Sequence, residues 1–431
     1  MNIEPLESRI APATIIALTD SDQLLRFNSA SPDSITASVP ILGLGATEDV
    51  EGIDFRPANG LLYGVAVDGT TARLLTIDPL TGATAQIGAT FAVTGSDFGV
   101  DFNPVADRLR VVSNTDLNLS INPNTGVATT QTSLNPGNPN VVGAAYTNSF
   151  PGTSSTSLFA IDSGSDTLAT IAPPSAGTLT NVGALGVGDV TAATGFDIGQ
   201  GTGESFAALT VGATTQLYSI NLTTGAATAL GNINAGTVSM RGLAVLQNTW
   251  DGSESATLDD PDNWVAGIAP VAGDSLLFPV GPTQLSVKSF YAANTAFNTV
   301  RFTGAGYSLS SEFANKITGG IRANFASGTT KVDGTNLLLS SPDGIAPGIV
   351  EVAQSGATLD FFQLKIATNL GVDFIGTGNV KIGTLGFETP IGGGDVRVQG
   401  AHVTLTGVLH SARTAHVQSG SLELLGFDFF G

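Results

Sequence analysis

Apolar and polar residues alternate along most of the chain in short runs, and Gly, Asn, Asp or Pro separates one run from the next. Alternation with a period of two is typical of β-strands that bury one face, and the separating residues favour tight turns. No segment shows a convincing helical spacing of apolar residues. The pattern therefore predicts an all-β protein.

Two landmarks recur at nearly equal spacing through the first 247 residues. One is an apolar residue that ends a strand before a tight turn, and its copies are Phe27, Ile77, Ile121, Ile171 and Ile220. The other is a short strand that begins with glycine, and its copies begin at Gly52, Gly99, Gly143, Gly195 and Gly242. Both landmarks step by 44 to 52 residues. Because a unit of this size holds four short strands, the repeat predicts a five-bladed β-propeller over residues 14–247.

The ends of this repeat predict how the ring closes. Residues 15–18, 24–27 and 35–39 read as three strands, and the glycine landmark at residues 52–55 begins the next blade from the inside. The repeat thus starts on a second strand and ends on a first strand near residues 240–245. We expect these two strands to pair within one blade, since two sheet edges would otherwise stay unpaired.

Two motifs of the repeat are similar to those of a known family. They are Gly52-Ile53-Asp54-Phe55-Arg56-Pro57 with Leu62-Tyr63-Gly64, and residues 99–110, which read Gly-Val-Asp-Phe-Asn-Pro-Val-Ala-Asp-Arg-Leu-Arg. Both resemble the bacterial domain-of-unknown-function 4394 family, and the resemblance covers most of residues 14–247. It implies a propeller-like, extracellular domain, and it brings no catalytic or ligand-binding residue with it.

The chain from residue 248 onward has a different character. It opens with Trp250-Asp251-Gly252, Asn263-Trp264 and Pro270-Val271-Ala272-Gly273-Asp274. Residues 248–302 resemble the start of autotransporter-like β-helical passenger segments, which carry such motifs in this order. Short alternating runs follow at ragged intervals, which predicts a parallel β-solenoid over residues 248–431. Because solenoids need polar caps and the sequence stops on a largely apolar stretch, we expect a fragment of a longer protein or a second chain that covers this end.

The first 13 residues precede the repeat and predict a leader or sorting arm. Acidic residues stand where a secretory signal has basic ones, and two prolines break any helix there. Pro5-Leu6-Glu7-Ser8-Arg9 resembles the Leu-Glu-Pro-Arg-type motif at the start of large bacterial surface proteins, although Ser8 interrupts the pattern. The resemblance implies export to the cell surface. The alternative is a short disordered arm.

Composition narrows the function classes. The chain has no cysteine, which excludes disulfide frameworks, thiolate zinc sites and cysteine nucleophiles. A net charge of −20 argues against nucleic acid or an anionic membrane surface as a partner, because both repel a polyanion. No apolar run is long enough for a transmembrane helix. All histidines follow residue 401, so the predicted propeller lacks the commonest general base and metal ligand.

Asp54, Asp101 and Asp197 share one position of the repeat, where the other two blades have Ala145 and Ala244. Innermost strands line the channel of a propeller, so these carboxylates could hold a cation such as calcium. We favour a structural interpretation, in which each buried carboxylate accepts backbone N–H hydrogen bonds between blades.

For the other charged groups, too, a ligand-binding role competes with a structural or solvent-exposed one. Arg56, Arg108 and Arg110 could bind an anionic ligand, but we expect them to neutralise neighbouring aspartates. Asp259, Asp260 and Asp262 are weak calcium candidates, and because their spacing is not that of an EF-hand we expect a solvated loop. We expect exposed histidines rather than a metal site at His402, His410 and His416.

Three functions remain open from the sequence. The leading one is a non-catalytic, extracellular or cell-surface module of a large bacterial surface protein, for structure or adhesion, with an unknown surface polymer or protein as partner and no cofactor. The second is a calcium-dependent, lactonase-like propeller hydrolase, which convergent Asp and Asn in the channel would favour. The third is a carbohydrate-binding module, which a cluster of Tyr63, Tyr146 and Tyr218 on one face would favour.

Overall fold

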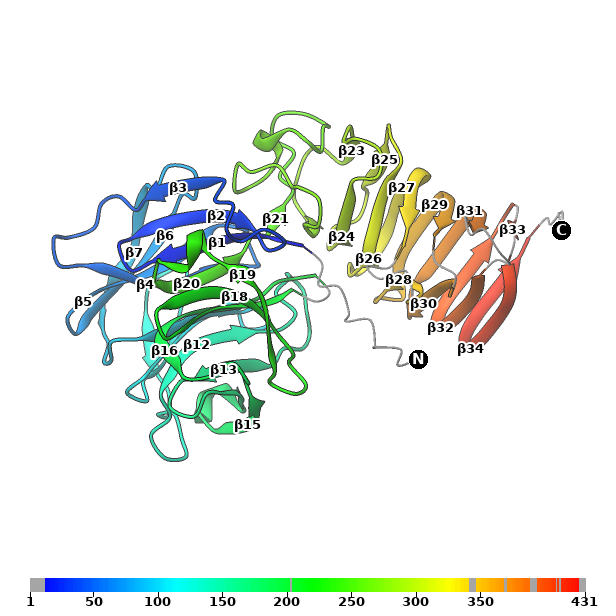
Figure 1. Ribbon diagram of the computed structural model, residues 1–431. Helices are drawn as coiled ribbons and strands as arrows, with labels where there is room; N and C mark the ends of the chain where they lie inside the picture. The colour runs from blue at the N-terminus through cyan, green and yellow to red at the C-terminus, as the bar shows by residue number, and fades with distance from the viewer. Residues whose placement is uncertain are drawn as a thin grey trace. The chain divides into compact units, whose positions relative to one another are not determined.

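The computed structural model describes residues 12–201, 204–340, 346–367, 370–387, 394–407, 409–410 and 412–425 (Figure 1). The leader predicted at residues 1–13 therefore lies almost entirely outside the described residues. The chain divides into two compact units, of which one comprises Pro12–Gln200 and Glu204–Gln247 and the other begins at Asn248. The helices in the described part are short 3-10 segments: η1 (Pro174–Ala176), η2 (Asn234–Gly236) and η3 (Pro261–Asn263). None of these is long and apolar enough to cross a membrane.

The first unit is a propeller of five four-stranded antiparallel blades, as the repeat predicts. In four blades the strands follow chain order from the inside outward. Blade 1 contains β4 (Asp49–Phe55), β5 (Leu62–Asp68), β6 (Thr71–Ile77) and β7 (Thr84–Ala92). Blade 2 contains β8 (Phe98–Asn103), β9 (Arg108–Ser113), β10 (Asn118–Ile121) and β11 (Ala128–Thr130). Blade 3 contains β12 (Val141–Tyr146), β13 (Leu158–Asp162), β14 (Thr167–Ile171) and β15 (Leu179–Ala184). Blade 4 contains β16 (Val190–Ile198), β17 (Ser205–Val211), β18 (Thr214–Ile220) and β19 (Ala227–Asn232).

Blade 5 joins the two ends of the repeat. Its strands are β20 (Met240–Val245), β1 (Thr14–Thr19), β2 (Gln23–Asn28) and β3 (Ala37–Pro40), in this order from the inside. Ile16 pairs with Ala244, and Ala17 pairs with Leu243, in antiparallel register. The predicted closure is therefore confirmed, and it leaves neither end of the ring with an open edge at this junction.

The innermost strands approach one another closely at their shared glycine, and at Gly52, Gly99 and Gly195 a Cβ would have no room unless its neighbours moved. These strands are neighbours around the ring in the order β4, β8, β12, β16, β20 and back to β4. A Cβ on Gly52 would lie 2.5 Å from a methyl carbon of Val100, and a Cβ on Gly99 would lie 2.7 Å from the backbone nitrogen of Ala144. At the other three landmark glycines the nearest atom would lie 2.6 to 3.2 Å away. The recurring glycine is thus explained by close backbone approach and not by a turn.

The second unit is a parallel β-solenoid of about six turns. One column of parallel strands consists of β21 (Asn248–Thr249), β22 (Leu276–Phe278), β24 (Ala296–Phe302), β26 (Asn315–Ala323), β28 (Gly348–Val352), β30 (Val372–Gly376), β32 (Gly394–Leu405) and β34 (Ala412–Leu424). The other consists of β23 (Ser286–Ser289), β25 (Ser308–Ser311), β27 (Ser327–Leu339), β29 (Gly356–Ile366), β31 (Asn379–Phe387) and β33 (Leu409–His410).

The solenoid core is built from ladders of apolar residues that occupy matching positions in successive turns. One buried ladder runs through Leu276, Val300, Ile321, Val350, Phe374 and Val398. A second runs through Leu309, Val332, Phe361, Ile382 and Leu405. Each turn buries its apolar side chains only against the turns beside it, so stability is distributed along the stack.

An aromatic cluster fills the beginning of the solenoid. The rings of Trp250 and Trp264 meet edge to face with centroids 5.4 Å apart, and Phe278 contacts both. Both indole N–H groups find backbone acceptors: Trp250 Nε1 donates to the Gln284 carbonyl and Trp264 Nε1 to the Leu258 carbonyl. The two tryptophans therefore have a packing role that satisfies their polar atoms.

Replacing Gly99 with alanine is expected to destabilise the propeller by about 1–3 kcal/mol, because the new Cβ would overlap the backbone of β12. Denaturant unfolding of the full chain, followed through the propeller transition, measures this. Gly45→Ala is the matched control, since its Cβ would have its nearest neighbour at an ordinary 3.6 Å. Equal unfolding free energies for the two variants would contradict the steric explanation.

Candidate functional site

Three aspartates from three blades meet at the centre of the propeller. Asp54 on β4, Asp101 on β8 and Asp197 on β16 each lie two residues after the landmark glycine, and each is at most 3% exposed. One carboxylate oxygen from each lies within 4.8 Å of those from the other two. Among the described residues, this is the group of three acidic or histidine side chains that could hold a metal ion. We call it the aspartate triad.

Each member of the triad joins its own blade to the next. The backbone N–H of Phe102 on β8 donates to Asp54 Oδ2 (2.7 Å), and that of Tyr146 on β12 donates to Asp101 Oδ1 (3.0 Å). In blade 4, Asp197 Oδ2 accepts from the backbone N–H of Val245 on β20 (2.6 Å). The predicted burial and backbone hydrogen bonding of these aspartates are thus what the structure shows.

Burial and mutual repulsion disfavour charge on the triad. Removal from water raises the pKa of Asp54 and Asp101 well above the usual range, and neighbouring carboxylates raise the pKa of both further. Burial also raises the pKa of Asp197, to about 6. A hydrogen bond between Asp101 and Asp197 raises the pKa of Asp101 and lowers that of Asp197. In this hydrogen bond Asp101 is therefore the donor and Asp197 the acceptor.

The triad could coordinate a cation in chemical terms, but it offers few ligands. Calcium takes about six to eight oxygen ligands. The two remaining blades place Ala145 and Ala244 at the equivalent position, and these side chains carry no oxygen. Three carboxylates that already accept backbone hydrogen bonds are better suited to holding blades together than to a complete calcium shell.

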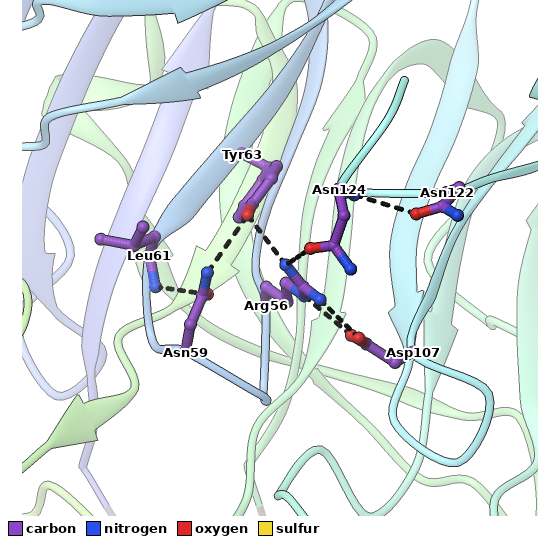
Figure 2. A network of polar contacts seen from close by, with 7 residues as sticks. All are labelled: Arg56, Asn59, Leu61, Tyr63, Asp107, Asn122 and Asn124. Carbon is purple, nitrogen blue, oxygen red and sulfur yellow. Dashed lines mark hydrogen bonds and ion pairs between the residues drawn. The ribbon is translucent and has the colours of Figure 1, made fainter. Parts of the chain in front are cut away.

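A second polar network joins blades 1 and 2 just after the C-terminal end of β4 (Figure 2). Arg56, which follows β4, binds both carboxylate oxygens of Asp107, and its Nη1 donates to Asn124 Oδ1 (2.8 Å) and Tyr63 Oη (3.2 Å). The hydroxyl of Tyr63 also accepts from Asn59 Nδ2 (3.1 Å). Asp107 and Asn124 belong to loops of blade 2, so this bidentate pair links neighbouring blades.

The other two candidate arginines differ from each other. Arg110 is buried, and it donates to Asn118 Oδ1 (2.6 Å) and to the hydroxyl of Tyr146 on blade 3 (3.3 Å). Arg108 is exposed on β9, and no described residue forms an ion pair with it. Arg108 and Arg110 lie on the same face of β9, so strand alternation does not separate them. Arg108 is the first residue of the strand and is exposed, whereas Arg110 is buried and reaches the next blade.

The tyrosine platform that a carbohydrate-binding module would need is not formed by the three candidate tyrosines. Tyr63, Tyr146 and Tyr218 are all buried, with exposed fractions of 5% or less. Their rings therefore cannot stack against a ligand in solvent.

The acidic loop of the second unit has a local structural role. Asp260 is the N-cap of η3, where it accepts from the Asp262 N–H (3.2 Å) and from the Ser255 hydroxyl (2.9 Å). Asp259 and Asp262 face solvent. Among the histidines, His402 and His416 are exposed on solenoid strands, and the side chain of His410 lies outside the described residues.

A cavity of about 240 Å³ opens at the mouth of the propeller channel, where the inner strands begin. Its wall includes one residue from directly before each landmark glycine: Glu51, Phe98, Val142, Thr194 and Arg241. Arg241 Nη1 lies 3.2 Å from a carboxylate oxygen of Glu51 and 3.4 Å from one of Asp49. Sequence reasoning missed this ring, although the varied residue before an unvarying glycine was a signal that could have revealed it.

Comparison with known proteins supports the family resemblance. The model of a family described as "Domain of unknown function (DUF4394)" matches residues 23–244, which is more than half of the chain. No curated protein matches the chain.

Several solved structures show limited similarity. A chain of a nidogen/laminin complex has a TM-score of 0.35 at 12% identity, over 55% of this chain and 98% of that chain. A putative 6-phosphogluconolactonase from Bacteroides fragilis has a TM-score of 0.31 at 14% identity, over 53% and 69%. A protein from Lactobacillus plantarum has a TM-score of 0.30 at 17% identity, over 53% and 69%.

Stability of the propeller is expected to fall as the pH rises above the unfolded aspartate pKa of 3.8 and through the folded value of about 6 for Asp197. Unfolded carboxyl groups keep their ordinary pKa values, whereas the folded triad holds protons at higher pH. The stabilising effect is therefore complete below the unfolded pKa and is lost as the pH rises through the folded values, about 6 for Asp197. Thermal melts across this range measure the slope.

Two variants of Asp101 distinguish the effect of its titration on stability from the effect of its hydrogen bonds. Asp101→Asn keeps an acceptor for Tyr146 and a donor for Asp197, so it should melt like the wild type near pH 5 and show a smaller pH slope. Asp101→Ala leaves the Tyr146 N–H without its acceptor and removes the donor to Asp197, so it should cost about 1–3 kcal/mol throughout. If the alanine variant melts like the wild type, the triad does not join the blades.

Proposed function

The chain belongs to the DUF4394 family, and we propose that it is a non-catalytic module of an extracellular or cell-surface protein, which acts in surface structure or adhesion. The observation that carries this proposal is the structural role of the aspartate triad in the channel. All three are buried, and all three connect adjacent blades. Groups that hold the ring together and have no access to solvent are poorly placed to act on a substrate.

The chemistry of the whole chain supports the same proposal. The propeller contains no histidine or cysteine, so it lacks the commonest catalytic base and the commonest strong nucleophile. A rigid ring joined in sequence to a stacked solenoid suits a display or adhesion role, because both units resist deformation through many repeated contacts. The leader motif at residues 5–9 supports export.

A calcium-dependent hydrolase is the second candidate, and the convergence of the triad oxygens within 4.8 Å is the observation that favours it. In this alternative, a cation would replace the shared proton between Asp101 and Asp197. The two candidates differ in a measurable way, since an ion that binds only the folded state stabilises it.

We expect thermal melts of the full chain to show no calcium-dependent shift of the propeller transition between EDTA and millimolar calcium. An ion at a hundredfold excess over its Kd would add about 2.7 kcal/mol, which corresponds to several degrees for a domain of this size. Asp101→Asn and Asp262→Asn assign any shift to the triad or to the acidic loop. A shift that Asp101→Asn abolishes would favour the hydrolase.

Surface location predicts that the chain is accessible from outside intact cells. Protease treatment of whole cells of the organism that carries it should remove the chain, while a cytoplasmic marker protein stays intact. Protection of the chain until the cells are lysed would contradict an extracellular role.

A further inference from the structure

We propose that the last turn of the solenoid binds a second copy of this chain, end to end, through antiparallel pairing of β34 with β34 of the partner subunit. β34 lies at the end of the strand stack (Figure 1), and among the described residues it pairs with β32 alone. Its other edge therefore presents backbone N–H and C=O groups that can pair with a further strand. This inference does not rest on the proposed function.

The apolar ladders of the solenoid core continue into β34, where they are incompletely covered. The matched pairs are Val396 with Ala415, Val398 with Val417, Val403 with Leu422 and Leu405 with Leu424. The four residues of β32 are at most 2% exposed, whereas Val417 is 49% and Leu424 is 45% exposed. Because the end of a solenoid needs a polar outer face to stay soluble, an apolar end of this kind indicates a surface that another chain covers.

The opposite end of the solenoid is filled by its own residues. Trp250 and Trp264 are at most 2% exposed, and both rings contact Phe278 in the first turn. The apolar face of β34 therefore has no open counterpart at the first turn of another copy. It can meet its own equivalent, and a contact between identical surfaces gives a closed dimer with two-fold symmetry rather than a fibre.

β34 crosses from one column of the solenoid to the other, which determines how two copies can meet. The first half of β32 pairs with β30 and its second half pairs with β31, and β34 follows β32 through both halves. Gly420 lies between the two halves of β34 at a φ of 83°. A two-fold axis through this crossing point lays the first half of one β34 against the second half of the other. The paired halves then run antiparallel.

The sequence of β34 is self-complementary in this arrangement. With the axis between Ser419 and Gly420, Val417 lies opposite Leu422 of the partner subunit, and Ala415 lies opposite Leu424 of the partner subunit. All four continue the core ladders, so apolar side chains meet apolar side chains.

The polar residues of β34 match in the same register. His416 and Glu423 are both exposed, and they lie opposite each other. An imidazole N–H can donate to a carboxylate, and such cross-strand pairs stabilise a sheet. Symmetry makes each contact occur twice. This matching of charge and apolar side chains favours a second copy over an unrelated strand.

Net charge and contact size indicate a weak dimer. Each copy carries a net charge of −20, so two copies repel each other at a distance, and salt screens this repulsion. A contact made by one strand from each copy is small beside the interfaces of permanent dimers. We therefore expect association that increases with protein concentration and with salt.

Sedimentation velocity of the full chain at about 1 to 200 µM tests the proposal. We expect the dimer fraction to rise across this range. Val417→Lys should weaken association by about tenfold or more, because it places a charge opposite Leu422 of the partner subunit. Val280→Lys is the matched control, since Val280 is 78% exposed and lies outside β34. It should leave the dimer unchanged, and circular dichroism should show that all variants are folded.

Two further sets of variants test the register. His416→Glu should weaken the dimer by about threefold or more, because two like-charged pairs would form, and adding Glu423→His to the same chain should restore it. The chain has no cysteine, so His416→Cys with Glu423→Cys should join two copies by disulfides under mild oxidation. Thr414→Cys with Glu423→Cys is out of register by two residues and should cross-link much less.

The proposal is overturned if the folded wild-type chain stays monomeric at every concentration tested. It is also overturned if Val417→Lys dimerises as the wild type does, because the dimer would then use another surface. Equal cross-linking of the two cysteine pairs, or no recovery in the His416→Glu, Glu423→His double variant, would contradict the antiparallel register.

Discussion

The close approach of the five inner strands around one axis is the constraint on which the propeller depends. Each landmark glycine lies against the next inner strand, and a Cβ there would be excluded at three of the five positions and tightly packed at the other two. The same geometry brings backbone N–H groups of one blade within reach of carboxylates of the previous blade. Close approach therefore favours glycine at this position and makes the aspartate hydrogen bonds possible.

Within four consecutive residues of each inner strand, three positions have different roles along the channel. In Glu51-Gly52-Ile53-Asp54 the first residue lines the mouth, the second permits strand contact, and the fourth joins the next blade. Alternation along the strand places Ile53 in the core beside them. The first of these positions varies in chemistry between blades, whereas the glycine does not, because the inner strands approach most closely at the glycine.

The buried triad shows how a negative cluster can persist in an apolar centre. Three ionised carboxylates at this distance would repel one another strongly at low dielectric. The raised pKa values of Asp54 and Asp101 favour their neutral forms, which reduces that charge, and backbone N–H groups stabilise the carboxylates that stay ionised. The solenoid also avoids repulsion between like charges. Lys331, Asp360 and Lys381 occupy matching positions in successive turns, so each charge lies beside one of opposite sign.

The sequence alone determined the all-β class, the five-unit period and the closing pair of strands, because these depend on local alternation and on equal spacing along the chain. It also indicated that Asp54, Asp101 and Asp197 share one environment, since they share one repeat position. It did not show that their oxygens meet, or that Arg56 binds Asp107 and Asn124 while Arg108 stays exposed. Those contacts join residues from different blades, and the distance between blades is set by packing around the axis. Only the tertiary structure, through its bulges and its strand-to-strand spacing, decided which side chains reach the channel mouth.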